Sequence, residues 1–230
     1  MRRLSTALII VALVSLAAPT VSFAQQSVTF SIGGFVPKGF DSRDRNDQIL
    51  DDASYLAFRM SDFNSVTFGG EYLVGLGRWF DAGLGVNWYS GSAHSVYADV
   101  INSNGTEIEQ DLKLRMVPFT ATVRVLPLGR NSGIRPYIGG GVAIVNWKYT
   151  ESGDFVDFTD GAIFPAQYEG SGTATGPLFL FGATVPLGTV GIGGEVRYQH
   201  AEGDLPADQF LLPKIDLGGW SYVATVHVRF

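Results

Sequence analysis

The stretch Gly219-Trp220-Ser221-Tyr222-Val223-Ala224-Thr225-Val226-His227-Val228-Arg229-Phe230 decides the fold. Every second residue from Trp220 to Phe230 is apolar, and most of the residues between them are polar. This alternation predicts a β-strand with one apolar face, because successive side chains of a strand point to opposite faces. Its length of roughly ten steps at ~3.4 Å, tilted by ~40°, rises about 26 Å, which matches the apolar band about 25 Å tall of strands that cross a membrane.

The same alternation predicts eight strands along the chain, at residues 28–33, 66–74, 80–88, 117–125, 137–149, 173–187, 190–199 and 220–230. The fifth and sixth are rich in glycine, so the facing of their side chains stays open. Short links at 75–77, 126–134 and 188 alternate with longer polar links at 37–64, around 102–105, at 151–172 and at 201–216. We therefore predict an all-β fold, an eight-stranded antiparallel up-and-down transmembrane β-barrel with both termini on the periplasmic side.

Alternation alone does not say which face is outside, because a soluble lipocalin-like barrel hides its apolar face in the interior. Aromatic residues at both ends of the apolar faces favour the membrane barrel, since they are typical of the two membrane interfaces. We expect an aromatic girdle of Phe80, Tyr137 and Phe230 on the turn side and Trp88, Trp147, Tyr198 and Trp220 on the loop side.

The first residues predict export. Arg2 and Arg3 precede an apolar run from Ala7 to Ala18, and small residues flank Phe23 in Ser22-Phe23-Ala24. This is the pattern of a cleaved signal peptide at 1–24, whereas a membrane-anchoring helix would need a longer apolar run. The domain left for the barrel is 25–230.

Composition excludes several classes of protein. The net charge of −6 becomes more negative once Arg2 and Arg3 are removed, so no basic surface for nucleic acid is expected. The chain has no cysteine, so it is not a small disulfide-stapled domain. No motif calls for a cofactor.

In its final strand and in Pro136-Tyr137-Ile138-Gly139-Gly140-Gly141, the chain resembles the small eight-stranded outer-membrane barrels of the OmpA/OmpX/OmpW type. The resemblance implies location in the outer membrane, with outer-membrane lipid and lipopolysaccharide as partners. It also implies recognition of the C-terminal strand by the barrel-assembly machinery. It names no extracellular ligand.

Charged residues on the polar faces predict an ion network in the lumen. The lumen of an eight-stranded barrel is just wide enough to be filled by side chains. We expect a structural network rather than a gated pore, because buried charges need partners in either case. Its expected members are Glu71, Asp81, Arg124, Glu195, Arg197, His227 and Arg229.

The link between the third and fourth strands contains Asn104-Gly105, a strong two-residue hairpin signal, so this hairpin is expected to extend above the membrane. Lys113 and Arg115 follow it with outward parity. They are placed to meet lipopolysaccharide phosphates, or to be ordinary solvated charges. In the first long link, Ile49, Leu56 and Met60 have helical spacing, which leaves a short amphipathic helix and disorder as alternatives.

An enzyme is the least favoured reading. The stretch from Arg197 to Asp204 resembles outer-membrane lipid A deacylases in which a histidine precedes a serine by two residues, but Glu202 stands where that serine would be. Without the hydroxyl there is no evident nucleophile. Acidic loop residues lack EF-hand spacing and the three histidines are dispersed, so no metal site is expected either.

We therefore expect an outer-membrane barrel without catalytic activity, with a packed charged lumen, long extracellular loops and a structural or surface-interaction role. The alternative is a narrow channel for small or apolar solutes. Function does not follow from the fold itself.

Overall fold

The computed structural model describes residues 25–230. The signal peptide predicted at Met1–Ala24 lies outside the described residues. Among the residues described, no helix is long and apolar enough to cross a membrane.

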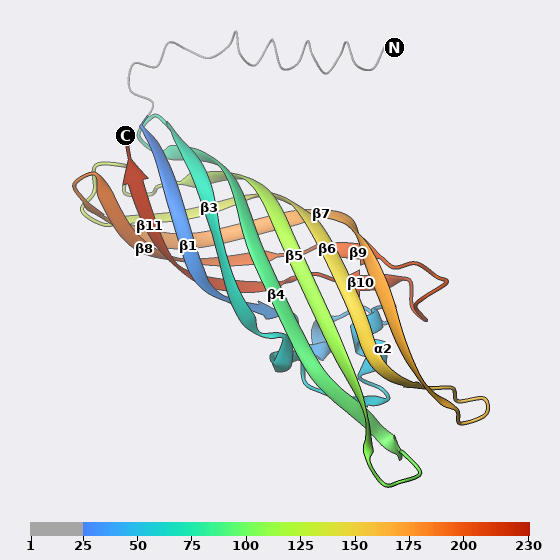
Figure 1. Ribbon diagram of the computed structural model, residues 1–230. Coiled ribbons are helices and arrows are strands. Elements are labelled where there is room, and N and C mark those ends of the chain that lie inside the picture. The colour runs from blue at the N-terminus through green and yellow to red at the C-terminus, as the bar shows by residue number, and fades with distance from the viewer. Residues whose placement is uncertain (1–24) are drawn as a thin grey trace, which may run out of the picture.

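Eight strands close into a barrel (Figure 1). Each pairs with its neighbours in antiparallel fashion, and the last strand closes the ring on the first, with Val28 opposite Val228. The predicted eight-stranded up-and-down barrel is confirmed. Its strands are β1 (Gln26–Pro37), β3 (Ser65–Leu76), β4 (Phe80–Ile101), β5 (Glu107–Val125), β6 (Arg135–Val156), β7 (Ile163–Leu187), β8 (Val190–Gln199) and β11 (Gly219–Arg229).

The connections divide the barrel into two ends. Links 77–79, 126–134 and 188–189 lie at one end, the turn end, where β1 begins and β11 finishes (Figure 1). Links 38–64, 102–106, 157–162 and 200–218 lie at the other end, the loop end. Asn104-Gly105 forms the tip of the predicted hairpin, with Gly105 at φ +83°. The expected loop at 151–172 is wrong: β6 and β7 stay paired out to Val156 and Ile163, so this hairpin, like the hairpin of β4 and β5, extends beyond the remaining strands (Figure 1).

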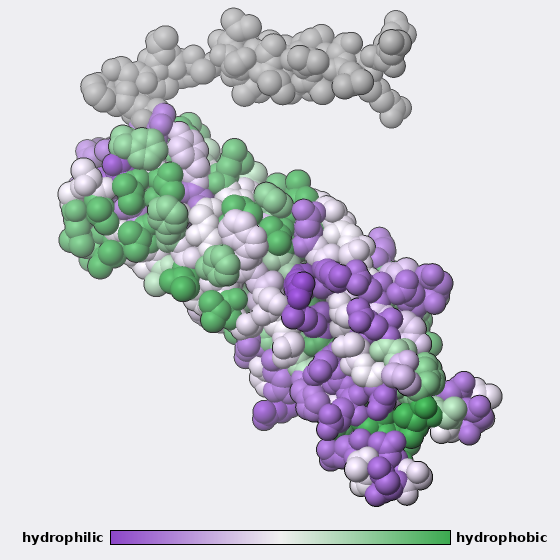
Figure 2. Space-filling view, viewed as in Figure 1, coloured by the Kyte–Doolittle hydropathy of each residue, from purple (hydrophilic) through white to green (hydrophobic). Residues whose placement is uncertain are grey.

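An apolar band surrounds the turn-end part of the barrel (Figure 2). Within β5, Val123 is 53% exposed while the adjacent Arg124 is 2% exposed, so the apolar face is the outer one. This excludes the lipocalin-like arrangement. Further along the same strand the outward residues become polar, as at Arg115, and hydrophilic residues cover the loop end (Figure 2).

The loop-end half of the interior is packed rather than open. A hydrophobic cluster fills it, with contributions from β1, β4, β5, β6, β7 and the loops, including Phe35, Tyr89, Met116 and Leu178. The link after β1 folds into this mouth as η1 (Phe40–Ser42), α2 (Gln48–Asp52), β2 (Leu56–Ala57) and η2 (Met60–Phe63), and the last link forms the hairpin of β9 (Glu202–Asp204) and β10 (Lys214–Asp216).

The first link is therefore ordered, although its helix is shorter than the spacing from Ile49 to Met60 indicates. Asp47 caps α2 by accepting a 3.2 Å hydrogen bond from the Leu50 amide, and its carboxylate also pairs with Arg43 at 2.9 Å. Ile49 is fully buried. The cap on α2 and the buried side chains of Ile49, Leu56, Met60 and Phe63 thus hold this segment in the barrel mouth.

Candidate functional site

Four charged side chains meet at the centre of the lumen. Glu71 projects from β3, Arg124 from β5, and Glu195 and Arg197 from β8. Arg124 contacts Glu71 and lies 3.0 Å from Glu195, while Arg197 contacts Glu195 and lies 3.7 Å from Glu71. Two positive and two negative charges therefore form a closed, neutral quartet, and each has an opposite charge within reach.

Neutral groups complete the quartet. Thr122 donates a 2.8 Å hydrogen bond to Glu71, and the Tyr137 hydroxyl donates one of 2.9 Å to Glu195. The Arg124 guanidinium also lies 4.7 Å from the centroid of the Tyr137 ring, a cation–π contact. A β-carbon at Gly83 would come within 2.4 Å of the Glu71 carboxylate, so the glycine leaves the space that the acid occupies.

The other three charged residues expected in the network lie outside the quartet. Asp81 pairs with Arg130, which comes from the turn 126–134. His227 is surrounded by the hydroxyls of three threonines, with Thr29 2.7 Å from its Nδ1 atom. Arg229 donates to the Gly188 carbonyl at the turn end. All three side chains face inward, but the predicted seven-residue network consists of one quartet and separate flanking contacts.

Little free volume remains beside the quartet. A cavity of about 50 Å³ lies on its turn side, lined by Arg124, Arg135 and His227 among others, and one of about 20 Å³ lies on its loop side, next to Asn87 and Arg197. These volumes are of the size of a few water molecules. The hydrophobic cluster then fills the interior towards the loop end.

The expectation of an aromatic girdle is partly wrong. Tyr137 and Trp147 are 5% and 4% exposed and point into the lumen, because the outward residues of β6 are Ile138, Val142 and Ile144. The remaining residues of the predicted girdle face outward: Phe80 and Phe230 at the turn end, and Trp88, Tyr198 and Trp220 where the apolar band meets the loop end. The rings of Tyr198 and Trp220 pack together at 4.8 Å.

A basic rim lies just beyond the apolar band on β5 and β6. Arg115 is exposed and Lys113 is half-buried, and both alternate with the buried Leu114 and Met116. Lys148 of β6 stands directly opposite Arg115, and its ammonium pairs with Glu169 at 2.6 Å. Lys148 is not among the residues predicted from the sequence, because the facing of side chains in its glycine-rich strand was open.

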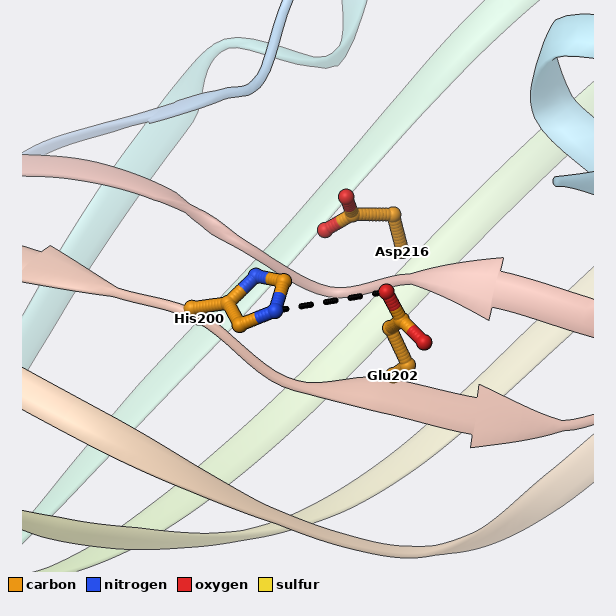
Figure 3. Close-up of side chains that lie close together, drawn as sticks. All are labelled: His200, Glu202 and Asp216. Carbon is orange, nitrogen blue, oxygen red and sulfur yellow. Dashed lines mark ion pairs between the residues drawn. The ribbon is translucent and has the colours of Figure 1, made fainter. Parts of the chain in front are cut away.

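His200, which directly follows β8, lies close to Glu202 of β9 and Asp216 of β10 (Figure 3). His200 Nε2 is 4.0 Å from Glu202. The Lys38 ammonium lies 2.7 Å from Asp216 and 2.8 Å from His200 Nδ1, so a cation already occupies the position beside two of the three possible metal ligands. We interpret this group as an ion-pair cluster of the last loop-end link.

A buried carboxyl pair, absent from the predicted site, lies in the loop-end half. Asp52 of α2 accepts hydrogen bonds from Tyr55 and Tyr149, both at 2.8 Å, and from Gln48 at 2.7 Å. Glu151 of β6 lies beside it and is 4% exposed. Burial raises the pKa of Asp52 to about 6, and burial together with the charge of Asp52 raises the pKa of Glu151 to about 9.

No protein-family model matches the chain, and no curated protein matches its sequence. Among solved structures, OprG from Pseudomonas aeruginosa matches with a TM-score of 0.52 and 13% identity, over 90% of this chain and 96% of OprG. Neisserial surface protein A matches with a TM-score of 0.45 and 12% identity, over 90% and 97%. Ail of Yersinia pestis matches with a TM-score of 0.43 and 12% identity, over 90% and 99%. The likeness to OprG shows that this chain has the fold of the small eight-stranded outer-membrane β-barrels.

Replacing Arg124 by alanine should destabilise the detergent-folded barrel by about 3–5 kcal/mol, because it leaves buried carboxylates in excess. Thermal unfolding followed by the gel shift between folded and unfolded barrel measures this loss. Arg115→Ala, which removes an exposed charge, is the matched control. Arg124→Met combined with Glu71→Gln should lose less than Arg124→Ala, since it restores neutrality. An unchanged melting temperature for Arg124→Ala contradicts the network.

Stability of the loop-end half should fall as pH rises. The pKa values of Asp52 and Glu151 are higher in the folded chain than the ordinary values near 4. Between about pH 4 and about pH 9 the folded state therefore binds more protons than the unfolded state. The proton-linked stabilisation is complete below pH 4 and is lost as pH rises through about 6 and about 9. Near-ultraviolet circular dichroism melts at pH 5, 7 and 9 should show this decline. Glu151→Gln should flatten it and Glu107→Gln should not; equal slopes in all three would refute the assignment.

Proposed function

We propose that the mature chain resides in the outer membrane as a closed barrel with a structural or surface-interaction role, and that its four loop-end connections face the cell exterior. The observation that carries this proposal is the combination of an apolar outer band with a lumen occupied by the charged quartet and the hydrophobic cluster. The loop end would then bind partners, and the barrel would hold the loops in place. The proposal includes no enzymatic activity.

We further propose lipopolysaccharide as a partner. The basic rim of Lys113, Arg115 and Lys148 stands immediately beyond the apolar band, at the level where the phosphates of the outer leaflet lie. Guanidinium and ammonium groups at that level pair with phosphate while their alkyl stems remain along the apolar surface. As the C-terminal strand, β11 is the proposed contact of the chain with the barrel-assembly machinery.

The closed lumen predicts that the protein does not conduct. Planar bilayers containing the folded barrel should show no discrete conductance steps in concentrated KCl, because the quartet and the hydrophobic cluster occupy the interior and the cavities beside the quartet measure about 50 and 20 Å³. Insertion is verified separately by the gel shift of the recovered protein. Reproducible steps from the wild-type barrel would favour the alternative, a narrow channel for small or apolar solutes.

The basic rim predicts phosphate-dependent binding of lipid A. The folded barrel in a non-ionic detergent should bind lipid A about tenfold more tightly than dephosphorylated lipid A, a difference of about 1.4 kcal/mol. The triple variant Lys113→Gln, Arg115→Gln, Lys148→Gln should lose that preference. A matched triple variant of loop-end cations, Arg45→Gln, Arg59→Gln, Lys214→Gln, should keep it. Equal loss in both variants would reduce the effect to net charge and contradict the rim as a site.

A further inference from the structure

A cleft of about 510 Å³ opens at the loop end. Its walls come from the hairpin of β6 and β7, from Tyr97 of β4, from the first long link around Tyr55, and from residues 207–211 of the last link. Its volume falls in the range of about 300–1,000 Å³ that is usual for small-molecule sites. Figure 2 shows a hydrophobic patch near the tips of the long hairpins, within the hydrophilic loop end.

Aromatic rings form much of the cleft surface. Tyr55 and Tyr97 stack at 5.9 Å, and Phe158 packs edge-on against both, at 6.4 and 6.2 Å. Phe155 and Tyr168 form a second edge-on pair at 4.8 Å. Phe158 is 69% exposed, so its ring is available to a ligand from solution.

All charged residues that line the cleft are acidic: Asp51, Glu151, Asp157 and Asp208. Glu151 is the deepest of them, at 4% exposure, and its Oε1 atom has no hydrogen-bond partner among the described residues. A buried acceptor without a partner is costly unless something supplies one. Asp52 lies beside it, and the Asp52 oxygens already accept hydrogen bonds from Tyr55, Tyr149 and Gln48. Of the two acids, Glu151 is therefore the one with an oxygen available to a ligand.

We propose that this cleft binds a small organic cation, an alkylammonium or quaternary ammonium ion, with the aromatic rings around its apolar groups and the side chain of Glu151 opposite its charge. Because burial raises the pKa of Glu151 to about 9, its carboxyl group is protonated in the empty cleft at neutral pH and releases that proton to solvent when the cation binds. Ring faces attract a cation through their quadrupole, and the attraction grows when the site is partly desolvated. A bare metal ion is a poorer fit, because it prefers a shell of oxygen ligands to aromatic faces. An anion is excluded by the uniform sign of the lining charges.

The test compares choline with its neutral carbon isostere, 3,3-dimethylbutan-1-ol, on the full folded barrel. Saturation-transfer difference NMR titrations are run in a maltoside detergent, because detergents with a phosphocholine headgroup would compete. We expect choline to bind at least about tenfold more tightly than the isostere, since the two differ only in charge. Equal affinity, or no choline binding, would overturn the proposal.

Two variants locate the site. Glu151→Gln should weaken choline binding about tenfold, while Glu107→Gln, which removes an exposed carboxylate outside the cleft, should leave it unchanged. Phe158→Leu keeps an apolar side chain at an exposed position, so it should fold normally, yet it should also weaken choline binding by losing the ring face. Wild-type affinity in Phe158→Leu, or equal loss in Glu107→Gln and Glu151→Gln, would show that the cleft is not the site.

Discussion

Within the apolar band, each strand of this barrel has an apolar outer face and a polar face in the lumen. The pairing of charges in the lumen is the constraint on which the rest of the structure depends. Eight strands enclose a space with little room for water, so each ionised side chain there needs a partner supplied by another strand. Glu71, Arg124, Glu195 and Arg197 meet this condition as a neutral quartet from three strands. Glycines such as Gly83 make the space for it, and the apolar residues are left for the outer face.

The loop-end half solves a different problem. Beyond the apolar band the outer surface is polar, so in this half the apolar side chains lie in the interior instead of on the outer face. The first link supplies Ile49 and Phe63 to that interior, both fully buried. The cost is a carboxyl pair, Asp52 and Glu151, enclosed with them. Glu71 and Glu195 in the other half each have a basic partner, whereas Asp52 and Glu151 have none among the described residues, so the two halves should differ in pH response.

Much of this fold could be predicted from alternation and turn chemistry. The last strand and the Asn104-Gly105 hairpin carry clear local signals. Alternation fails where Gly139-Gly140-Gly141 removes the side chains that would set the phase, and Tyr137 and Trp147 were therefore assigned to the wrong face. The site was harder still. Thr122 faces the same side of its strand as Arg124, so its place beside the charged quartet could have been predicted. The contact of Asp52 with Glu151 depends on how the first link folds into the barrel mouth, and no local sequence pattern encodes that.

The most direct test of the account asks which tryptophans touch lipid. Variants retaining one tryptophan each, at position 88, 147 or 220, are folded into vesicles of brominated lipid, and quenching of their fluorescence is compared with that in unbrominated lipid. Trp88 and Trp220, each 41% exposed on the outer face, should be strongly quenched, and Trp147, 4% exposed, should not. Quenching of Trp147 with no quenching of Trp88 and Trp220 would reverse the two faces and contradict the structure of the lumen proposed here.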